Sequence, residues 1–177
     1  RGWAVAMPSY DLAPTVTIGE ITRQIHAFIE RVSSLANGPI RLSGHSAGGH
    51  LVTRMICTDT PLSHEVRQRI DRVVSISGVH DLRPLLKTQM NADFRLDVAQ
   101  AAAESPALHE PMADVELVCW VGADERPEFV RQSELLANIW TGFGLSTAVY
   151  RAPGEHHFNV IDGLADSASP LCEALFA

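Results

Sequence analysis

The chain has 177 residues, enough for one domain with a sizeable core, and its 46% hydrophobic and 20% charged residues are ordinary for a globular protein. Its net charge of -7, with no basic stripe, argues against nucleic acid and anionic membrane surfaces as partners. No apolar run approaches the length of a membrane span, and the three scattered cysteines fit reduced thiols in a cytoplasmic protein.

The first residues already look like the middle of a fold. Arg1 is not methionine, and residues 2–7 (GWAVAM) form a short apolar run that predicts a buried strand ending at Pro8. We therefore expect the chain to be the C-terminal part of a longer protein. Residues 17–35 then predict a helix, because apolar residues recur at helical spacing and an Asn-Gly-Pro sequence stops it.

Strands and helices alternate through the rest of the chain. After the segment 39–56, strands are predicted over residues 71–78, 115–121 and 145–150. Helices are predicted over residues 65–69, 128–139, 158–164 and 170–176. This alternation predicts an α/β fold with a mostly parallel sheet and helices on both faces. Residues 80–114 contain no predicted strand, and we interpret them as a small cap-like insertion in a single domain, residues 1–177.

The segment 39–56, PIRLSGHSAGGHLVTRMI, contains the pattern G-x-S-x-G at Gly44 to Gly48. A strand that turns sharply into a helix would hold Ser46 on the turn with its hydroxyl exposed. We expect glycine at both ends of the pattern because the strained backbone leaves no room for a Cβ atom. The N–H of Ala47 is then the predicted donor to an oxyanion. The alternative is a Gly-rich turn with an incidental serine.

Two later strand ends carry an acid and a histidine, in the chain order serine, acid, histidine that this pattern requires. Asp124 and Glu125 follow the third of the four strands beyond residue 39, and His156 and His157 follow the fourth. Because sites gather beyond the carboxyl ends of parallel strands, these groups are expected to converge on Ser46. Taken singly, the acids could cap the next helix and the histidines could be surface residues.

The choice within each pair depends on weaker signals. His157 precedes the apolar Phe158, which would pack at the start of a helix, so His157 is the preferred general base. Asp124 is the commoner residue type for the acid of such a triad. From the residues alone, Asp124 and Glu125 both remain open.

With these residues in place, the sequence resembles the α/β-hydrolase fold and, more closely, its arylformamidase (kynurenine formamidase) and esterase group. The resemblance covers nearly the whole chain and rests on SYDLAP (9–14), GHSAGGHL (44–51), SGVHDLRPLL (77–86), Ser105-Pro106, ERPEFVRQS (125–133) and HHFNVI (156–161). In that group the acid typically stands two residues before the proline of a D-S-P-E-F-like run, which implies Glu125 with Asp124 as the alternative. The histidine typically precedes Phe, which implies His157.

The resemblance also implies a reaction. Ser46 would be the nucleophile, which takes up a formyl or other acyl group and is then cleared by water, with His157 and Glu125 as its catalytic partners. The expected substrate is a small-molecule acyl amide or ester, most specifically an aryl formamide such as N-formylkynurenine. The alternatives are a general short-acyl carboxylesterase and a non-catalytic binding module.

Such enzymes carry an upstream H-G-G-type loop that donates further N–H groups to the oxyanion. Neither that loop nor the first strands of the fold precede residues 2–7 in this sequence. We expect them in the longer protein. An open sheet edge in this chain would invite pairing between copies, so the sequence leaves a homo-oligomer open.

Three other residues near the predicted site, His45, His50 and Tyr10, are considered for metal binding, packing or contact with substrate. No cofactor is expected, and no metal, because His45 and His50 beside the serine match no ligand spacing. His45 is expected to pack at the variable position of the turn. Tyr10, at a predicted strand end, could contact a substrate, and a packing role is an equal alternative.

Overall fold

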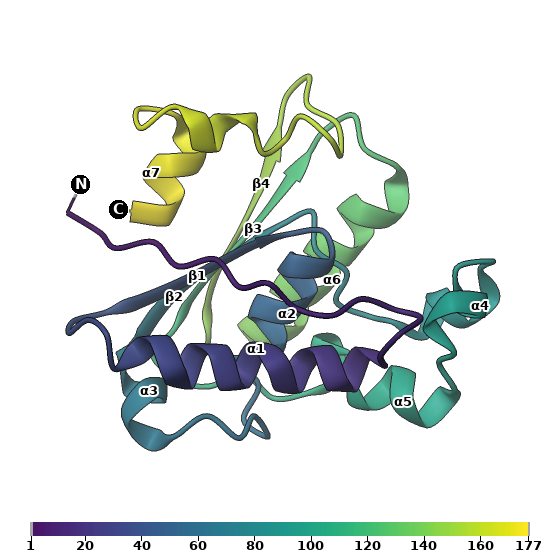
Figure 1. The fold of residues 1–177 in the computed structure, drawn as a ribbon. Helices are drawn as coiled ribbons and strands as arrows, with labels where there is room; N and C mark the ends of the chain where they lie inside the picture. The colour runs from purple at the N-terminus through teal and green to yellow at the C-terminus, as the bar shows by residue number, and fades with distance from the viewer. Residues whose placement is uncertain (1, 177) are drawn as a thin grey trace.

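The computed structural model describes residues 2–176, which are arranged around a four-stranded sheet (Figure 1). The strands are β1 (Ile40–His45), β2 (Ile70–Ile76), β3 (Glu116–Gly122) and β4 (Ser146–Ala152). Their order across the sheet is their order in the chain, and every neighbouring pair is parallel. The predicted parallel sheet is therefore confirmed. Because the strands are parallel, their four carboxyl ends lie side by side, and we call this side the carboxyl edge of the sheet.

Helices cover both faces of this sheet, as predicted (Figure 1). One face carries α1 (Ile18–Ser33), α2 (Ala47–Arg54) and α6 (Pro127–Gly142), and the other carries α7 (Pro170–Phe176). Successive residues of a strand point to opposite faces, so Val73 and Leu117 join the hydrophobic cluster under α2 and α6, whereas Val74 and Val118 join the one under α7. The short α3 (His64–Arg69) leads into β2.

Helix α1 begins where its sequence provides a capping box. The Thr17 hydroxyl accepts the Glu20 N–H, and the Glu20 carboxylate accepts the Thr17 N–H at 2.7 Å. Ile21, Ile25 and Ile29 are buried along one stripe of the helix, which seats α1 against the core. Across residues 2–176, no helix combines the length and the apolar character needed to cross a membrane.

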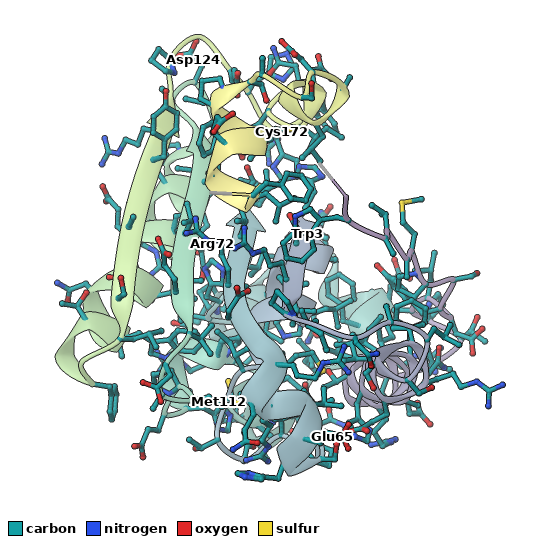
Figure 2. All side chains as sticks on the ribbon, turned by 90° about the vertical axis from the view of Figure 1, so that its left-hand side faces the viewer. Trp3, Glu65, Arg72, Met112, Asp124 and Cys172 are labelled. Atoms are coloured by element: carbon teal, nitrogen blue, oxygen red, sulfur yellow. The ribbon has the colours of Figure 1, made fainter. Side chains whose placement is uncertain are left out.

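The strand predicted over residues 2–7 does not form. Val5 and Met7 are 79% and 86% exposed, and the segment crosses the molecule as an extended chain (Figure 1). Side chains hold it, since the Arg41 guanidinium lies 4.8 Å from the Trp3 ring centroid, close to α7 (Figure 2). An apolar run becomes a strand only when its N–H and C=O groups pair with a neighbouring strand. Within the part of the chain described, β1 pairs with β2 alone, and residues 2–7 do not join its other edge.

The helix predicted over residues 158–164 is also wrong, because only a 3-10 turn, η3 (Asp162–Ala165), forms there. The Asn159 side chain accepts the His156 N–H at 2.7 Å, which stabilises a turn in competition with a helix. Phe158 is 81% exposed and therefore supplies no apolar face to the core. The remaining helices and strands lie within a few residues of their predicted bounds.

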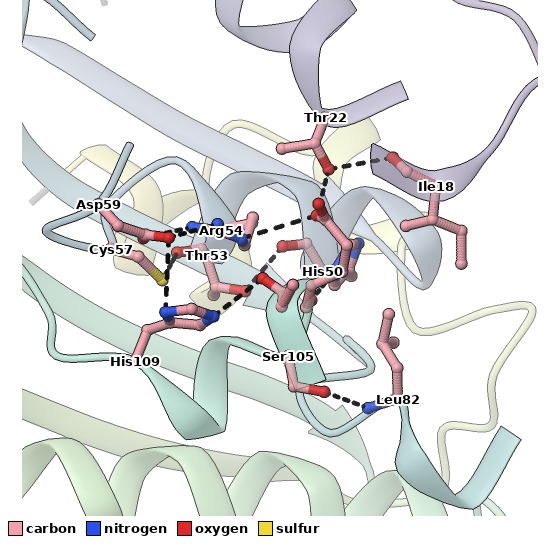
Figure 3. Close-up of polar contacts among 12 residues, drawn as sticks. Ile18, Thr22, His50, Thr53, Arg54, Cys57, Asp59, Leu82, Ser105 and His109 are labelled. Atoms are coloured by element: carbon pink, nitrogen blue, oxygen red, sulfur yellow. Dashed lines mark hydrogen bonds and ion pairs between the residues drawn. The ribbon is translucent and has the colours of Figure 1, made fainter. Parts of the chain in front are cut away.

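The segment between β2 and β3 consists of short helices: η1 (Arg83–Lys87), α4 (Asn91–Phe94), α5 (Val98–Ala103) and η2 (Pro106–Leu108). Polar contacts fasten it to α1 and α2 (Figure 3). The Glu104 carboxylate accepts the Thr22 hydroxyl at 2.7 Å, and the Glu104 carbonyl accepts the His50 Nε2–H at 2.7 Å. Arg54 lies 3.6 Å from the same carboxylate and also pairs with Asp59. The role of the segment as a cap stays a prediction.

Besides His50, a buried histidine, His80, lies just beyond β2. His80 is fully buried, its Nδ1–H donates to the Gln132 carbonyl at 3.0 Å, and its Nε2 accepts the Ser75 hydroxyl at 2.9 Å. Burial lowers the pKa of His80 to about 4. The imidazole is therefore neutral at neutral pH and ties β2 to α6.

We expect the free energy of unfolding to fall on mild acidification because of His80. In the unfolded chain a histidine binds a proton near pH ~6.5, whereas folded His80 does so only near pH 4. Between these values the unfolded state binds more protons, so stability that is present above pH ~6.5 is lost as the pH falls, by at most about 1.4 kcal/mol per pH unit.

Urea unfolding at several pH values between about 7 and about 5 measures this slope. The control is His80→Asn, whose amide can still donate to the Gln132 carbonyl but cannot titrate. In the variant, the free energy of unfolding should change less steeply with pH. The difference in slope should be at most about 1.4 kcal/mol per pH unit, which corresponds to one proton. Equal slopes in the two proteins would contradict the assignment.

Candidate active site

Each of the four strands ends beside one polar residue of a common cluster. Ser46 directly follows β1, Ser77 directly follows β2, and Glu125 and His157 lie shortly beyond β3 and β4. The ladder continues past the strands, since the Ser46 N–H donates to the Ile76 carbonyl at 2.8 Å. The carboxyl edge of the sheet therefore assembles residues that lie far apart in the sequence.

Three of the predicted site residues are joined by hydrogen bonds. His157 Nδ1 lies 2.8 Å from Glu125 Oε2, and His157 Nε2 lies 3.1 Å from Ser46 Oγ. Since a carboxylate can only accept, Nδ1–H donates to Glu125 and Nε2 accepts the Ser46 hydroxyl. In this tautomer the imidazole can take a proton from Ser46 while the carboxylate faces its other nitrogen.

The alternative acid and histidine lie outside this chain of hydrogen bonds. Asp124 is exposed on the turn after β3 (Figure 2), and its backbone N–H donates to the Glu155 carbonyl at 2.9 Å. His156 is exposed, and its Nδ1 accepts the Phe158 N–H at 3.2 Å. The structure thus brings Ser46, Glu125 and His157 together and leaves Asp124 and His156 apart.

The turn at Ser46 is strained in the way the motif predicts, but only one of the two glycines is sterically required. Ser46 has φ 56° and ψ −113°, which non-glycine residues rarely adopt. A Cβ atom at Gly44 would meet the backbone of Gly48, with the Cα at 2.9 Å. A Cβ atom at Gly48 would meet nothing within 4 Å, so the expectation for Gly48 is wrong. The steric constraint acts on Gly44, because its missing Cβ is what lets the Gly48 backbone approach.

The N–H of Ala47 belongs to the first residue of α2. The first N–H groups of a helix have no carbonyl partner within it, and they carry the positive end of the helix dipole. They lie next to Ser46, so negative charge that develops on the oxygen of a carbonyl group under attack by Ser46 Oγ would be stabilised there.

The Glu125 side chain is fully buried, and its carboxylate has hydrogen-bond donors at both oxygens. Oε1 accepts the Gly122 N–H at 3.0 Å and the hydroxyl of Ser77. Oε2 accepts the ring N–H of His157. A buried carboxylate needs such donors to offset the loss of water.

Aromatic rings enclose His157. Phe129 stacks on it at a centroid distance of 4.2 Å, Phe158 meets it edge-on at 5.5 Å, and the His45 ring lies at 4.7 Å. His45 Nε2–H also donates to the carbonyl of His157 at 2.8 Å. Burial, and then the proximity of His157, lowers the pKa of His45, which keeps it a neutral donor.

Sequence reasoning missed several of these contacts. His45 was expected only to pack, and neither Ser77 nor Phe129 was singled out. Ser77 and Phe129 both lie in segments that carry the family resemblance, and this was the available signal. Ser77 directly follows β2, and Phe129 lies in the first turn of α6. Tyr10 lies in a loop rather than at a strand end, and its ring packs against the cluster under α1, α2 and α6. Its contact with substrate stays a prediction.

Two cavities lie away from this cluster. A cavity of about 590 Å³ opens beside Asp71, Glu116 and Ser146, where β2, β3 and β4 begin. A second, of about 400 Å³, lies beside Pro39 and Arg69. Both are at the amino edge of the sheet, opposite Ser46. The candidate site is defined by the hydrogen bonds among Ser46, Glu125 and His157.

No protein-family model matches the chain. It is 29% identical to the kynurenine formamidase of Salmo salar over 185 residues and 27% identical to that of Danio rerio over 184 residues. Both alignments cover 99% of this chain and 62% of the relative.

Solved structures of hydrolases are also similar to the chain. A putative thioesterase from Silicibacter sp. superposes with a TM-score of 0.92 at 46% identity, covering 99% of this chain and 65% of that one. An esterase/lipase from an uncultured bacterium has a TM-score of 0.71 at 18% identity, covering 95% and 64%. The chain has the α/β-hydrolase fold. This α/β-hydrolase is similar to kynurenine formamidases and to esterase-like proteins, and it spans 62% of the length of the formamidases it matches.

The two glycines of the turn in this α/β-hydrolase should respond differently to alanine. Gly44→Ala forces a methyl group into the Gly48 backbone, and overpacking of this kind costs about 1–3 kcal/mol. Gly48→Ala places its methyl group in open space within α2, where alanine favours the helix by about 0.5–1 kcal/mol. Urea unfolding of the two variants measures the difference. Equal losses of stability would contradict the close approach of the two backbones.

Proposed function

We propose that this chain supplies the catalytic residues of a serine hydrolase that transfers an acyl group to water through an acyl-enzyme. The observation that carries the proposal is the hydrogen-bonded chain from Glu125 through His157 to Ser46, at a strained turn that opens a helix. Ser46 is the nucleophile, His157 the general acid and base, and Glu125 the residue that fixes the ring of His157.

In the first half-reaction Ser46 Oγ attacks the carbonyl carbon of an amide or ester while its proton passes to His157 Nε2. The negative charge that forms on the carbonyl oxygen is stabilised by the Ala47 N–H and the amino end of α2. His157 then gives its proton to the leaving amine or alcohol, and the acyl group remains on Ser46. Glu125 stabilises the imidazolium that exists between these two proton transfers.

In the second half-reaction water replaces the leaving group. His157 Nε2 takes a proton from the water as its oxygen attacks the acyl carbon, and returns a proton to Ser46 Oγ as the acid departs. Phe129 stacks on the His157 ring, and the hydrogen bond from His45 holds the His157 main-chain carbonyl, so the base keeps its place through both half-reactions. The same residues thus act twice with opposite proton movements.

The similarity to kynurenine formamidases supports an aryl formamide, such as N-formylkynurenine, as the substrate. The second candidate is a carboxylesterase for short acyl esters, which is favoured by the esterase structures that share the fold. A short-acyl thioester is a third substrate worth measuring, because the structure with 46% identity is described as a putative thioesterase.

We expect Ser46→Ala and His157→Ala each to reduce kcat by about a thousandfold or more, because each removes a group that acts in every proton transfer. Glu125→Gln should also cause a large loss. Asp124→Asn and His156→Ala are the matched controls, one residue away in each case, and should retain activity. Steady-state kinetics on the full-length protein tests this. An active His157→Ala beside an inactive His156→Ala would overturn the assignment.

The substrate is decided by comparing kcat/KM for N-formylkynurenine, a short p-nitrophenyl ester and a short-acyl thioester, with Ser46→Ala as the control. We expect the formamide to be preferred and its turnover to require Ser46. A preference for the ester or thioester would keep the mechanism and change the substrate. A serine-reactive phosphonate distinguishes the non-catalytic alternative, since failure to label Ser46 in the full-length protein would contradict a hydrolase.

A further inference from the structure

Ser77 is a serine in a conformation that favours glycine. It directly follows β2 and has φ 48°, although it is not glycine. The residue is fully buried, and its N–H donates to the Trp120 carbonyl at 2.7 Å, which extends the pairing of β2 with β3. Its hydroxyl donates to Glu125 Oε1. A strained residue persists only where the surrounding structure fixes it, and such strain is characteristic of functional sites.

The Glu125 carboxylate depends on this hydroxyl for its orientation. Glutamate has three side-chain torsions, so its backbone position alone does not fix where Oε2 lies. The Ser77 hydroxyl and the Gly122 N–H approach Oε1 from two different strands, and together they leave Oε2 facing His157 Nδ1. If the hydroxyl is removed, one donor remains at Oε1, and the buried carboxylate can rotate away from the ring.

The backbone around Ser77 leaves little freedom for another arrangement. A Cβ atom at the following Gly78 would meet Ser75 Oγ and would lie 2.5 Å from His80 Nε2. A Cβ atom at Gly49 would lie 2.7 Å from the Cα of Gly78, so α2 packs directly on this turn. The tight packing fixes the left-handed backbone at position 77. Glycine would suit that backbone better than serine, and the hydroxyl is what serine adds.

We propose that Ser77 is a positioning residue that aligns the Glu125 carboxylate with His157, at the cost of a strained backbone. Its effect on turnover rests on the proposed function, whereas its effect on the Glu125–His157 hydrogen bond does not. The Ser77 hydroxyl donates to Glu125 rather than to Ser46 or His157, so it acts through Glu125. Its loss should therefore lower kcat and leave KM little changed.

Two substitutions separate the hydroxyl from the strain. Ser77→Gly removes both, and Ser77→Ala removes the hydroxyl but keeps a Cβ atom at positive φ. Both should lower kcat by about tenfold to a hundredfold, as expected for a lost hydrogen bond to a charged group. Ser77→Gly should nevertheless unfold at a higher urea concentration than Ser77→Ala. Asp114→Gly is the matched control, because it relieves a positive φ of 63° at the amino edge of the sheet and should leave kcat unchanged.

A double-mutant cycle tests whether Ser77 acts through Glu125. In the Glu125→Gln background, Ser77→Gly should cause little further loss of kcat, because the carboxylate that it aligns is already gone. An undiminished loss in that background would overturn the proposal, since it would show an independent structural effect. So would a kcat for Ser77→Gly equal to that of the unsubstituted protein.

The hydrogen bond itself gives a readout that does not depend on substrate. The proton on His157 Nδ1, strongly deshielded by the carboxylate, is followed by proton NMR of the full-length protein, with Glu125→Gln to assign it. Ser77→Gly should move this resonance upfield and speed its exchange with water, whereas Asp114→Gly should not. If the phosphonate fails to label Ser46 in the unsubstituted protein but the resonance moves in Ser77→Gly, the proposed function fails and the positioning role stands. A resonance unmoved by Ser77→Gly overturns the positioning role.

Discussion

The abrupt change of direction from β1 to α2 is the constraint on which the candidate site depends. The chain reverses within one residue, Ser46, and this is permitted because Gly44 carries no Cβ that would meet Gly48. A second close approach, between Gly49 and Gly78, seats α2 against the end of β2. Two effects follow from one turn. The Ser46 hydroxyl is lifted beyond the edge of the sheet, and the free N–H groups of α2 are brought beside it.

The buried acid imposes the second requirement, because a carboxylate without water must be matched by donors. Glu125 meets it with one main-chain N–H, one hydroxyl and one imidazole N–H, which come from three different strand ends. The same three contacts fix its geometry. His157 is held in turn by Glu125, by Phe129 on one ring face and by the bond from His45 to its carbonyl. The same hydrogen bonds therefore replace the lost water around the acid and align the base.

The sequence was sufficient wherever the signal was local. Apolar runs located β2, β3 and β4, and apolar residues at helical spacing before an Asn-Gly-Pro stop located α1, all to within a few residues. The G-x-S-x-G pattern located the turn. The sequence was not sufficient where pairing decides the outcome, since residues 2–7 are apolar enough for a strand but, within the described part of the chain, do not pair with β1 or another strand. Asp124 and Glu125 are adjacent and chemically alike, so only the turn after β3 decides which one faces inward. The contact of Ser77 with Glu125 joins two strand ends and leaves no periodic trace in the sequence.

Ser46 and Ser77 occupy equivalent places, each one residue past a strand and each at positive φ. A left-handed conformation costs a non-glycine residue about 1–2 kcal/mol, which is comparable to the net value of a single hydrogen bond. Local preference therefore cannot hold either serine in place. Each is fixed by a main-chain bond to the next strand, from Ser46 to Ile76 and from Ser77 to Trp120, so the sheet that orders the site also sustains its strain. Rigidity is needed at this edge because small rotations of Glu125 would be transmitted to His157 through the hydrogen bond between them.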